Sequence, residues 1–164
     1  MHASSFDRSA SKPELYAALC ASLDSLIAGE TDPIANLANS AALVWEALPD
    51  INWAGFYLLR GGELVLGPFQ GRPACVRIAL GKGVCGTAAD RRQTIVVEDV
   101  NAFPGHIACD AASRSEIVVP LISGGSLLGV LDVDAPRVGR FDEEDRRGLE
   151  AVGRIVSRRI GIAA

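Results

Sequence analysis

The chain has few of the residues that build specialised scaffolds. Its 164 residues include four cysteines, fewer than a disulfide-dense secreted domain would carry in a shorter chain. No apolar run approaches the roughly 18 residues that a membrane-spanning helix needs. The first 14 residues are polar and lack the apolar stretch of a signal peptide. We therefore expect a cytoplasmic protein that does not span a membrane, with its cysteines present as thiols unless they bind metal or do redox chemistry.

Positive charge is also scarce. The net charge is −4 and the isoelectric point about 5.2, and basic residues cluster only in pairs such as Arg91-Arg92 and Arg158-Arg159. A protein that binds duplex DNA normally has a basic stripe, so we expect no nucleic-acid partner. Apolar residues make up 49% of the chain and charged residues 22%, which is typical of a globular protein. The length fits about one domain.

Helical patterns occur toward both ends of the chain. Ser11 and Glu14 have the spacing of a capping box, and apolar residues at helical spacing follow them up to Gly29. A second apolar stripe begins after Asp32-Pro33, a typical helix start. A closing helix is predicted after Phe141-Asp142. We expect a flexible N-terminus over 1–11 and a single domain over 12–164.

The central part of the chain has the pattern of strands. We predict strands over 53–59, 63–66, 75–79, 94–98, 116–122 and 127–134, a loop over 67–73, a short helix near 87–91 and an irregular excursion over 101–115. Gly61-Gly62 and Gly124-Gly125 predict tight hairpins, which imply antiparallel pairing. Helices at the chain ends can cover one face of such a sheet, so the predicted fold class is α+β.

A glycine-rich segment over 81–86 fits the pattern G-x-G-x-x-G. A dinucleotide-binding fingerprint requires a β-α-β unit and an acidic residue about 20 positions later. The neighbouring strands are predicted to be antiparallel, and acids follow much sooner, at Asp90, Glu98 and Asp99. A glycine-lined turn that shapes a pocket is the better interpretation.

The four cysteines fall into two groups. Cys20 shares a helical stripe with Leu23 and Ile27, which indicates an inert core thiol. Cys75, Cys85 and Cys109 lie within 35 residues, near predicted loops and element ends. They are compatible with a zinc site, with unrelated packing or with thiol–disulfide chemistry.

Spacing alone leaves these three alternatives open. Zinc would use His106 and Cys109 at H-x-x-C spacing, but the paired C-x₂₋₄-C knuckles of structural sites are missing. Redox chemistry needs a thiolate nucleophile and a second thiol within reach. His106 could lower the pKa of Cys109, or it could be a loop residue without a role.

Several carboxylates and aromatic residues are spaced so that their side chains would lie on the same face of a strand. Asp132 and Asp134 are two apart, so both point to one face, and Glu116 on the preceding strand could join them across the hairpin. Carboxylates at the end of an apolar strand are costly unless a cation or solvent meets them. Trp53 and Tyr57 share a parity and are either core residues or an aromatic wall for a cationic or methyl-bearing ligand.

Several segments together resemble one family. The segments are Gly67–Cys75 (GPFQGRPAC), Gly81–Ala88 (GKGVCGTA), Phe103–Asp110 (FPGHIACD), Ser115–Val118 (SEIV) and Gly129–Asp134 (GVLDVD). They resemble the free methionine-(R)-sulfoxide reductases, which are single-domain enzymes of the GAF fold. The resemblance runs from about Tyr16 to Ile160, and its central third is the most specific part.

The resemblance implies a function and a role for each matching residue. It implies reduction of free L-methionine (R)-S-oxide, with Cys109 as the catalytic thiol, Cys75 as the usual resolving thiol and Cys85 as an alternative disulfide partner. Substrate contacts would come from Trp53, Tyr57, Glu116, Asp132 and Asp134. Thioredoxin is the implied reductant, with NADPH involved only indirectly, no bound cofactor or metal, and a homodimer as the implied assembly.

Two other function classes remain open on the sequence. A GAF sensor that binds a small ligand without turnover shares the architecture, although such modules are usually fused to an output domain. A zinc-stabilised interaction domain would use the cysteines as ligands. Catalytic turnover and metal content, respectively, discriminate these alternatives from a reductase.

Overall fold

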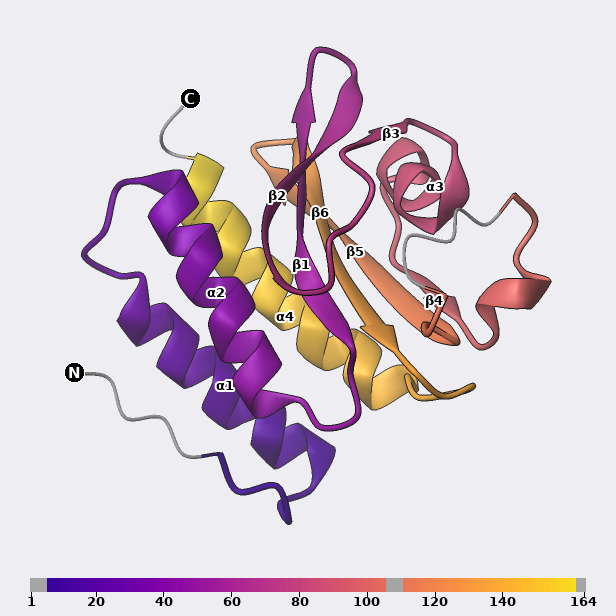
Figure 1. The fold of residues 1–164 in the computed structure, drawn as a ribbon. Helices are drawn as coiled ribbons and strands as arrows, with labels where there is room; N and C mark the ends of the chain where they lie inside the picture. Colours follow the sequence, from indigo (N-terminus) through magenta and orange to yellow (C-terminus); the bar gives the residue numbers. More distant parts are fainter. Residues whose placement is uncertain (1–5, 106–110, 162–164) are drawn as a thin grey trace.

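A six-stranded antiparallel sheet separates a layer of three helices from a smaller layer with one helix (Figure 1). This computed structural model describes residues 6–105 and 111–161. The elements in chain order are α1 (Lys12–Leu26), α2 (Pro33–Ala47), β1 (Trp53–Arg60), β2 (Glu63–Gly71), β3 (Arg77–Ala79), α3 (Gly83–Arg91), β4 (Ile95–Val97), the 3₁₀ turn η1 (Val100–Ala102), β5 (Ser115–Ser123), β6 (Ser126–Ala135) and α4 (Glu143–Ile160).

The strand order confirms the predicted fold class. The sheet runs β3-β2-β1-β6-β5-β4, and every paired neighbour in it is antiparallel. The two predicted hairpins are β1–β2 and β5–β6, closed at Gly61-Gly62 and Gly124-Gly125 with positive φ at all four glycines. The central pair, β1 and β6, therefore joins two hairpins that are far apart in the sequence.

The helix starts also follow the sequence signals. Ser11 donates its backbone N–H to Glu14 at 3.0 Å, and Asp32 accepts from the backbone N–H groups of Ile34 and Ala35 at 2.9 Å. Asp142 caps α4 in the same way. These bonds satisfy N–H groups that have no partner within the helix.

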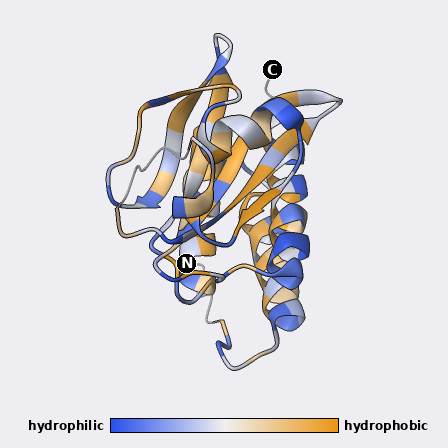
Figure 2. Cartoon of the chain, turned by 90° about the vertical axis from the view of Figure 1, so that its right-hand side faces the viewer, coloured by the Kyte–Doolittle hydropathy of each residue, from blue (hydrophilic) through white to orange (hydrophobic). Residues whose placement is uncertain are grey.

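Alternating residues of the central strands enter two separate cores. Helices α1, α2 and α4 cover one face, where Ala54, Phe56, Leu131 and Val133 pack. The outward side of α4 is largely hydrophilic (Figure 2), whereas α2 also exposes the apolar side chains of Ile34 and Trp45. Trp53, Tyr57 and other residues of opposite parity enter the second core, together with residues of α3. The helices at the two chain ends thus lie on one face, as predicted.

The segment 67–73 is not the predicted loop, because β2 continues through Gly71. Its register against β1 shifts between Gly55 and Tyr57, so that Gly67 and Pro68 together oppose one residue of β1. Such a bulge absorbs a glycine and a proline without ending the strand. Among the described strands, β3 pairs only with 63–65 of β2, so none of them needs a ladder donor from Pro68 on that side.

A buried ionic network joins the elements of the helical layer. Arg140, only 4% exposed, donates from Nη1 to both carboxylate oxygens of Asp145 at 3.1 Å. Lys12 and the hydroxyl of Tyr16 donate to the same carboxylate at 2.5 and 2.9 Å. The guanidinium of Arg140 also donates to the carbonyl oxygen of Pro49 at 3.1 Å. The network ties α1 and α4 to the connection between α2 and β1.

Two sequence expectations concern the termini and membranes. Within the expected flexible stretch 1–11, Phe6 packs against the core of the helical layer, whereas 1–5 lie outside the described residues. No helix in the described part of the chain has the length and apolar character needed to cross a membrane.

Candidate active site

The three predicted carboxylates meet on the face of the sheet opposite the three-helix layer. Glu116 of β5 is paired with Asp134 of β6, and Asp134 is in turn paired with Trp53 of β1. Directly paired residues point to the same face, so these three side chains form one row across three strands. Asp132 lies in the next row of the same face, between Gly55 and Val118.

The glycine-rich segment brings a thiol to this acidic row. Gly81 and Gly83 have positive φ, and Gly86 lies so close to the carbonyl oxygen of Ala79 that a Cβ would collide with it. This tight connection places the first turn of α3 on the sheet, and Cys85 Sγ lies 3.9 Å from Glu116 Oε1 as its hydrogen-bond donor. The segment therefore forms a turn and the first residues of α3, and it brings the thiol of Cys85 to the acidic row.

The buried groups of this cluster all favour their protonated forms. Cys85, Glu116 and Asp132 are only 4–6% exposed. Burial raises the pKa of Asp132 to about 7, even though hydrogen bonds from Cys85 and Glu116 lower it. Burial, followed by the charges of Asp132 and Asp134, raises the pKa of Glu116 well above its usual value. Burial and the same acids raise the pKa of the Cys85 thiol.

One oxygen of the cluster is unsatisfied. Among the described residues, no group donates a hydrogen bond to Asp132 Oδ1, although this atom is fully buried. A buried carboxylate oxygen without a donor is unfavourable. The cluster is therefore suited to receive a cationic or proton-bearing group from a ligand.

Aromatic rings form one wall beside the carboxylates. Trp53 stacks on Tyr57 with ring centroids 5.9 Å apart and on Phe69 of β2 at 5.2 Å. Gly55 makes room for this arrangement, because a Cβ there would collide with Phe69 and lie 2.8 Å from the Trp53 ring. The sequence identified Trp53 and Tyr57 but not Phe69, since the predicted loop hid its strand parity with them.

The same aromatics hold the segment that follows β2. Trp53 Nε1 donates to the carbonyl oxygen of Arg72 at 3.1 Å, and the Tyr57 hydroxyl donates to the carbonyl oxygen of Cys75 at 3.1 Å. The half-buried Cys75 thus follows a segment tethered from β1. Trp53 and Tyr57 link the acidic cluster to this cysteine.

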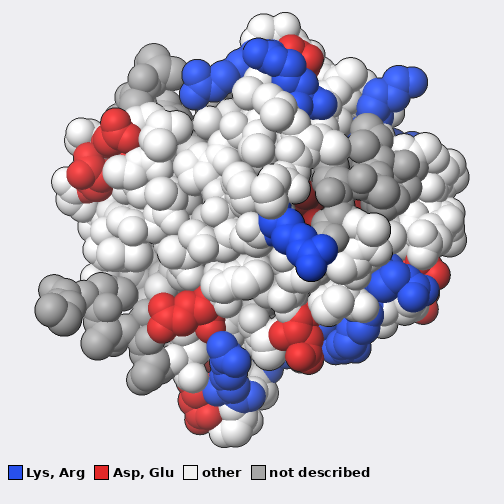
Figure 3. Space-filling model, in the orientation of Figure 1, with Lys and Arg blue, Asp and Glu red and all other residues white. Residues whose placement is uncertain are grey.

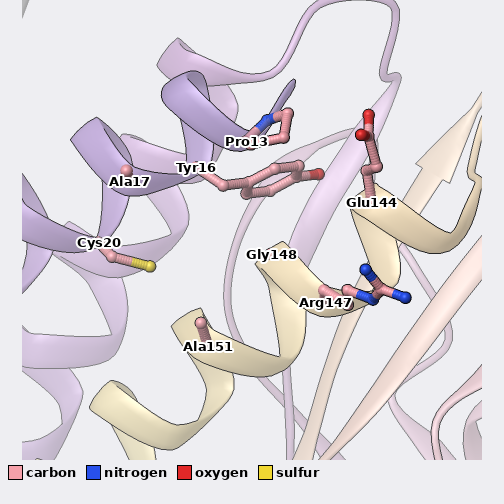
Figure 4. A pocket seen from close by; sticks show the side chains of 8 residues that line it. All are labelled: Pro13, Tyr16, Ala17, Cys20, Glu144, Arg147, Gly148 and Ala151. Carbon is pink, nitrogen blue, oxygen red and sulfur yellow. The ribbon is translucent and has the colours of Figure 1, made fainter. Parts of the chain in front are cut away.

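The structure agrees in part with the predicted grouping of the cysteines. Cys75 is disulfide-bonded, whereas Cys20 and Cys85 are free thiols. Cys20 is half-buried rather than a fully buried core residue: it lies against the core and lines a groove between α1 and α4 (Figure 4). Burial raises its pKa, which agrees with an unreactive thiol. Cys109 and His106, two further candidates, lie outside the described residues.

Comparisons with known proteins identify the family. A GAF domain model matches residues 37–160. The chain is 59% identical over 138 residues to the free methionine-R-sulfoxide reductase of Escherichia coli, covering 84% of each chain. It is 46% identical over 155 residues to the free methionine-R-sulfoxide reductase of Saccharomyces cerevisiae, covering 90% of this chain and 86% of the relative.

This chain belongs to the free methionine-R-sulfoxide reductase family. A solved structure of the Neisseria meningitidis free methionine-R-sulfoxide reductase, in complex with its substrate, has a TM-score of 0.95 and 47% identity, covering 99% of this chain and 98% of the other. The predicted α+β GAF fold is thereby confirmed. Within this family, the acidic cluster, the aromatic wall and the tethered Cys75 constitute the candidate active site of the chain.

Proposed function

We propose that this protein reduces free L-methionine (R)-S-oxide to L-methionine as a thiol-dependent oxidoreductase. The observation that carries the proposal is the cluster of the buried Glu116 and Asp132 with the half-buried Asp134, which faces an aromatic wall on the same side of the sheet. A free amino acid brings an ammonium group, and this cation matches a site with uncompensated carboxylate oxygen. The names of the relatives support the same substrate.

The acidic cluster accounts for a preference for the free amino acid. In a peptide, the nitrogen of methionine sulfoxide is an uncharged amide, which would leave buried carboxylates without a cation. We assign the ammonium contacts to Asp132 and Asp134, and the methyl-bearing end to the wall of Trp53 and Tyr57. Binding of the ammonium would favour the charged form of Asp132.

The chemistry that we propose begins at Cys109. Its thiolate attacks the sulfoxide sulfur, the S–O bond breaks, and the oxygen is transferred to the cysteine as a sulfenic acid while methionine leaves. The oxygen needs a proton or hydrogen bond as it departs. Glu116 is a suitable donor because burial and neighbouring charges raise its pKa and keep it protonated.

Regeneration of the enzyme requires a second thiol. We propose that Cys75 attacks the sulfenic acid, expels water and forms a disulfide with Cys109. The disulfide bond at Cys75 and the tether from Tyr57 support this choice. The raised pKa of Cys85 makes it a poorer nucleophile, which leaves it as the alternative partner. Thioredoxin would supply the two electrons, with NADPH as the indirect source, in a cytoplasmic homodimer.

A coupled assay with thioredoxin, thioredoxin reductase and NADPH tests the proposal. We expect turnover of the R sulfoxide of free methionine, at least roughly 100-fold slower turnover of the S sulfoxide, and no turnover by Cys109→Ser. Cys20→Ser is the matched control and should retain full activity. Equal rates on the two sulfoxides would refute the substrate assignment, and an active Cys109→Ser variant would refute the nucleophile.

A further inference from the structure

The buried cluster of Cys85, Glu116 and Asp132 has the donor set of a soft divalent metal site. One sulfur and two carboxylate oxygens, one from each residue, all lie within 4.8 Å of one another. Each residue comes from a different element, α3, β5 and β6 respectively. We propose that Zn²⁺ binds these three groups as an inhibitor, in competition with the ammonium group of the substrate; the competition, though not the metal site, rests on the proposed function.

The separations suit a tetrahedral ion after small movements. Zinc bound at about 2.3 Å to sulfur and about 2.1 Å to oxygen holds its ligand atoms roughly 3.5 Å apart. Cys85 Sγ and Glu116 Oε1 are 3.9 Å apart. Side-chain rotations that move these atoms by well under an ångström would therefore bring them to the separation of two zinc ligands. Three protein ligands leave the fourth position to water.

A second observation points to a cation at this place. Asp132 is 6% exposed, and its Oδ1 has no hydrogen-bond partner within the described part of the chain. Zinc would supply the missing partner and allow the carboxyl and thiol groups to lose their protons together.

The type of donor selects among metal ions. Mg²⁺ and Ca²⁺ require oxygen ligands and more of them, whereas a thiolate together with carboxylates suits Zn²⁺ or Co²⁺. The other deeply buried acid, Asp145, offers a contrast in the same molecule. Arg140, Lys12 and Tyr16 already occupy its oxygens, so no metal is expected there.

Cobalt titration of the reduced, metal-free full-length protein tests the site without relying on activity. We expect a Co²⁺–thiolate charge-transfer band that Zn²⁺ abolishes. The band should remain in Cys20→Ser and Cys75→Ser, disappear in Cys85→Ser, and require at least roughly tenfold more Co²⁺ in Asp132→Asn. Circular dichroism of each variant controls for folding.

Three results would overturn the proposal. These are the absence of a thiolate band in the wild type, a band that survives Cys85→Ser, and a band that is lost in Cys75→Ser, which would place the metal on the thiols outside the cluster. Addition of free methionine (R)-sulfoxide should raise the Zn²⁺ concentration needed for half-occupancy at least about tenfold; unchanged occupancy would refute the competition. If the metal binds as expected but the protein has no reductase activity, the proposed function fails while the metal site stands.

Discussion

Two buried acidic groups on opposite faces of the sheet differ in how their charge is compensated. In the helical layer, the Asp145 carboxylate receives hydrogen bonds from Arg140, Lys12 and Tyr16. On the other face, Asp132 is also buried, yet one of its oxygens lacks a donor among the described residues. The first site is complete in the protein alone, whereas the second requires a ligand or a proton.

This difference in charge compensation indicates which acid serves stability and which serves function. A buried charge with all its hydrogen bonds made is a structural element, and loss of one partner is costly. Acids clustered without compensation destabilise the fold, and such groups with perturbed pKa values are typical of active sites. Asp145 is therefore expected to control folding, and the cluster around Asp132 to control ligand binding.

The largest effect is expected on stability, at Asp145, whose charge is compensated within the protein. Asp145→Asn leaves the buried guanidinium of Arg140 without its counter-charge and should lower the free energy of unfolding by about 3–5 kcal/mol, as measured by urea denaturation. Glu144→Gln, an exposed neighbour on the same helix, should change it by less than about 0.5 kcal/mol. A loss below about 1 kcal/mol for Asp145→Asn would contradict this assignment.

The next effect is expected on catalysis, at the cluster around Asp132. Glu116→Gln removes the proposed proton donor and should lower kcat roughly 100-fold with a much smaller change in KM, as measured in the thioredoxin-coupled assay. Glu98→Gln, an exposed acid outside the cluster, is the matched control and should retain full activity. An unchanged kcat in Glu116→Gln would exclude its role as donor.

A third prediction concerns stability against pH. The folded pKa of Asp132 is raised from 3.8 to about 7, so its proton is held in the folded state while the unfolded state has lost it. The contribution of Asp132 is fully present below pH 3.8 and is lost as the pH rises through about 7. Asp132→Asn should therefore raise the free energy of unfolding at pH 8 by about 4 kcal/mol, with little gain near pH 4. A variant that is less stable than the wild type at pH 8 would contradict the account.

The smallest effect is expected when a tyrosine is replaced by phenylalanine on either face of the sheet. Tyr57→Phe and Tyr16→Phe each remove one hydroxyl hydrogen bond and should each cost about 1 kcal/mol of stability. Only Tyr57→Phe should also slow disulfide formation after a single turnover, because Tyr57 tethers the backbone at Cys75. Equal disulfide formation rates in the two variants would show that the tether has no part in that step.

Much of the candidate site follows from strand parity in the sequence. The spacing of Asp132 and Asp134 and the hairpin that precedes them predict a shared face with Glu116, and the register confirms it. The position of Cys85 over these acids did not follow from the sequence pattern, because it depends on how α3 packs on the sheet. Phe69 was missed for a different reason: a bulge extends β2 through a glycine and a proline that indicated a loop.

The ionic network around Asp145 could not be predicted from the sequence pattern either. The sequence predicts only a helix start after Phe141-Asp142, which agrees with the hydrogen bond that the Asp142 backbone N–H donates to Asp145. Its pairing with Arg140 and Tyr16 depends on the packing of α4 against α1, and no local pattern encodes that contact. Helix starts and strand faces are local properties, whereas the partners of a buried charge are set by tertiary packing.

In the proposed function, the cluster around Asp132 binds the ammonium group of a free amino acid. Its most direct test is a comparison of kcat/KM for free methionine (R)-sulfoxide with that for the N-acetylated compound, which lacks the ammonium. We predict a preference for the free compound of at least about 100-fold, because the acetylated form leaves buried carboxylates without a cation. Equal kcat/KM values for the two compounds would contradict the account.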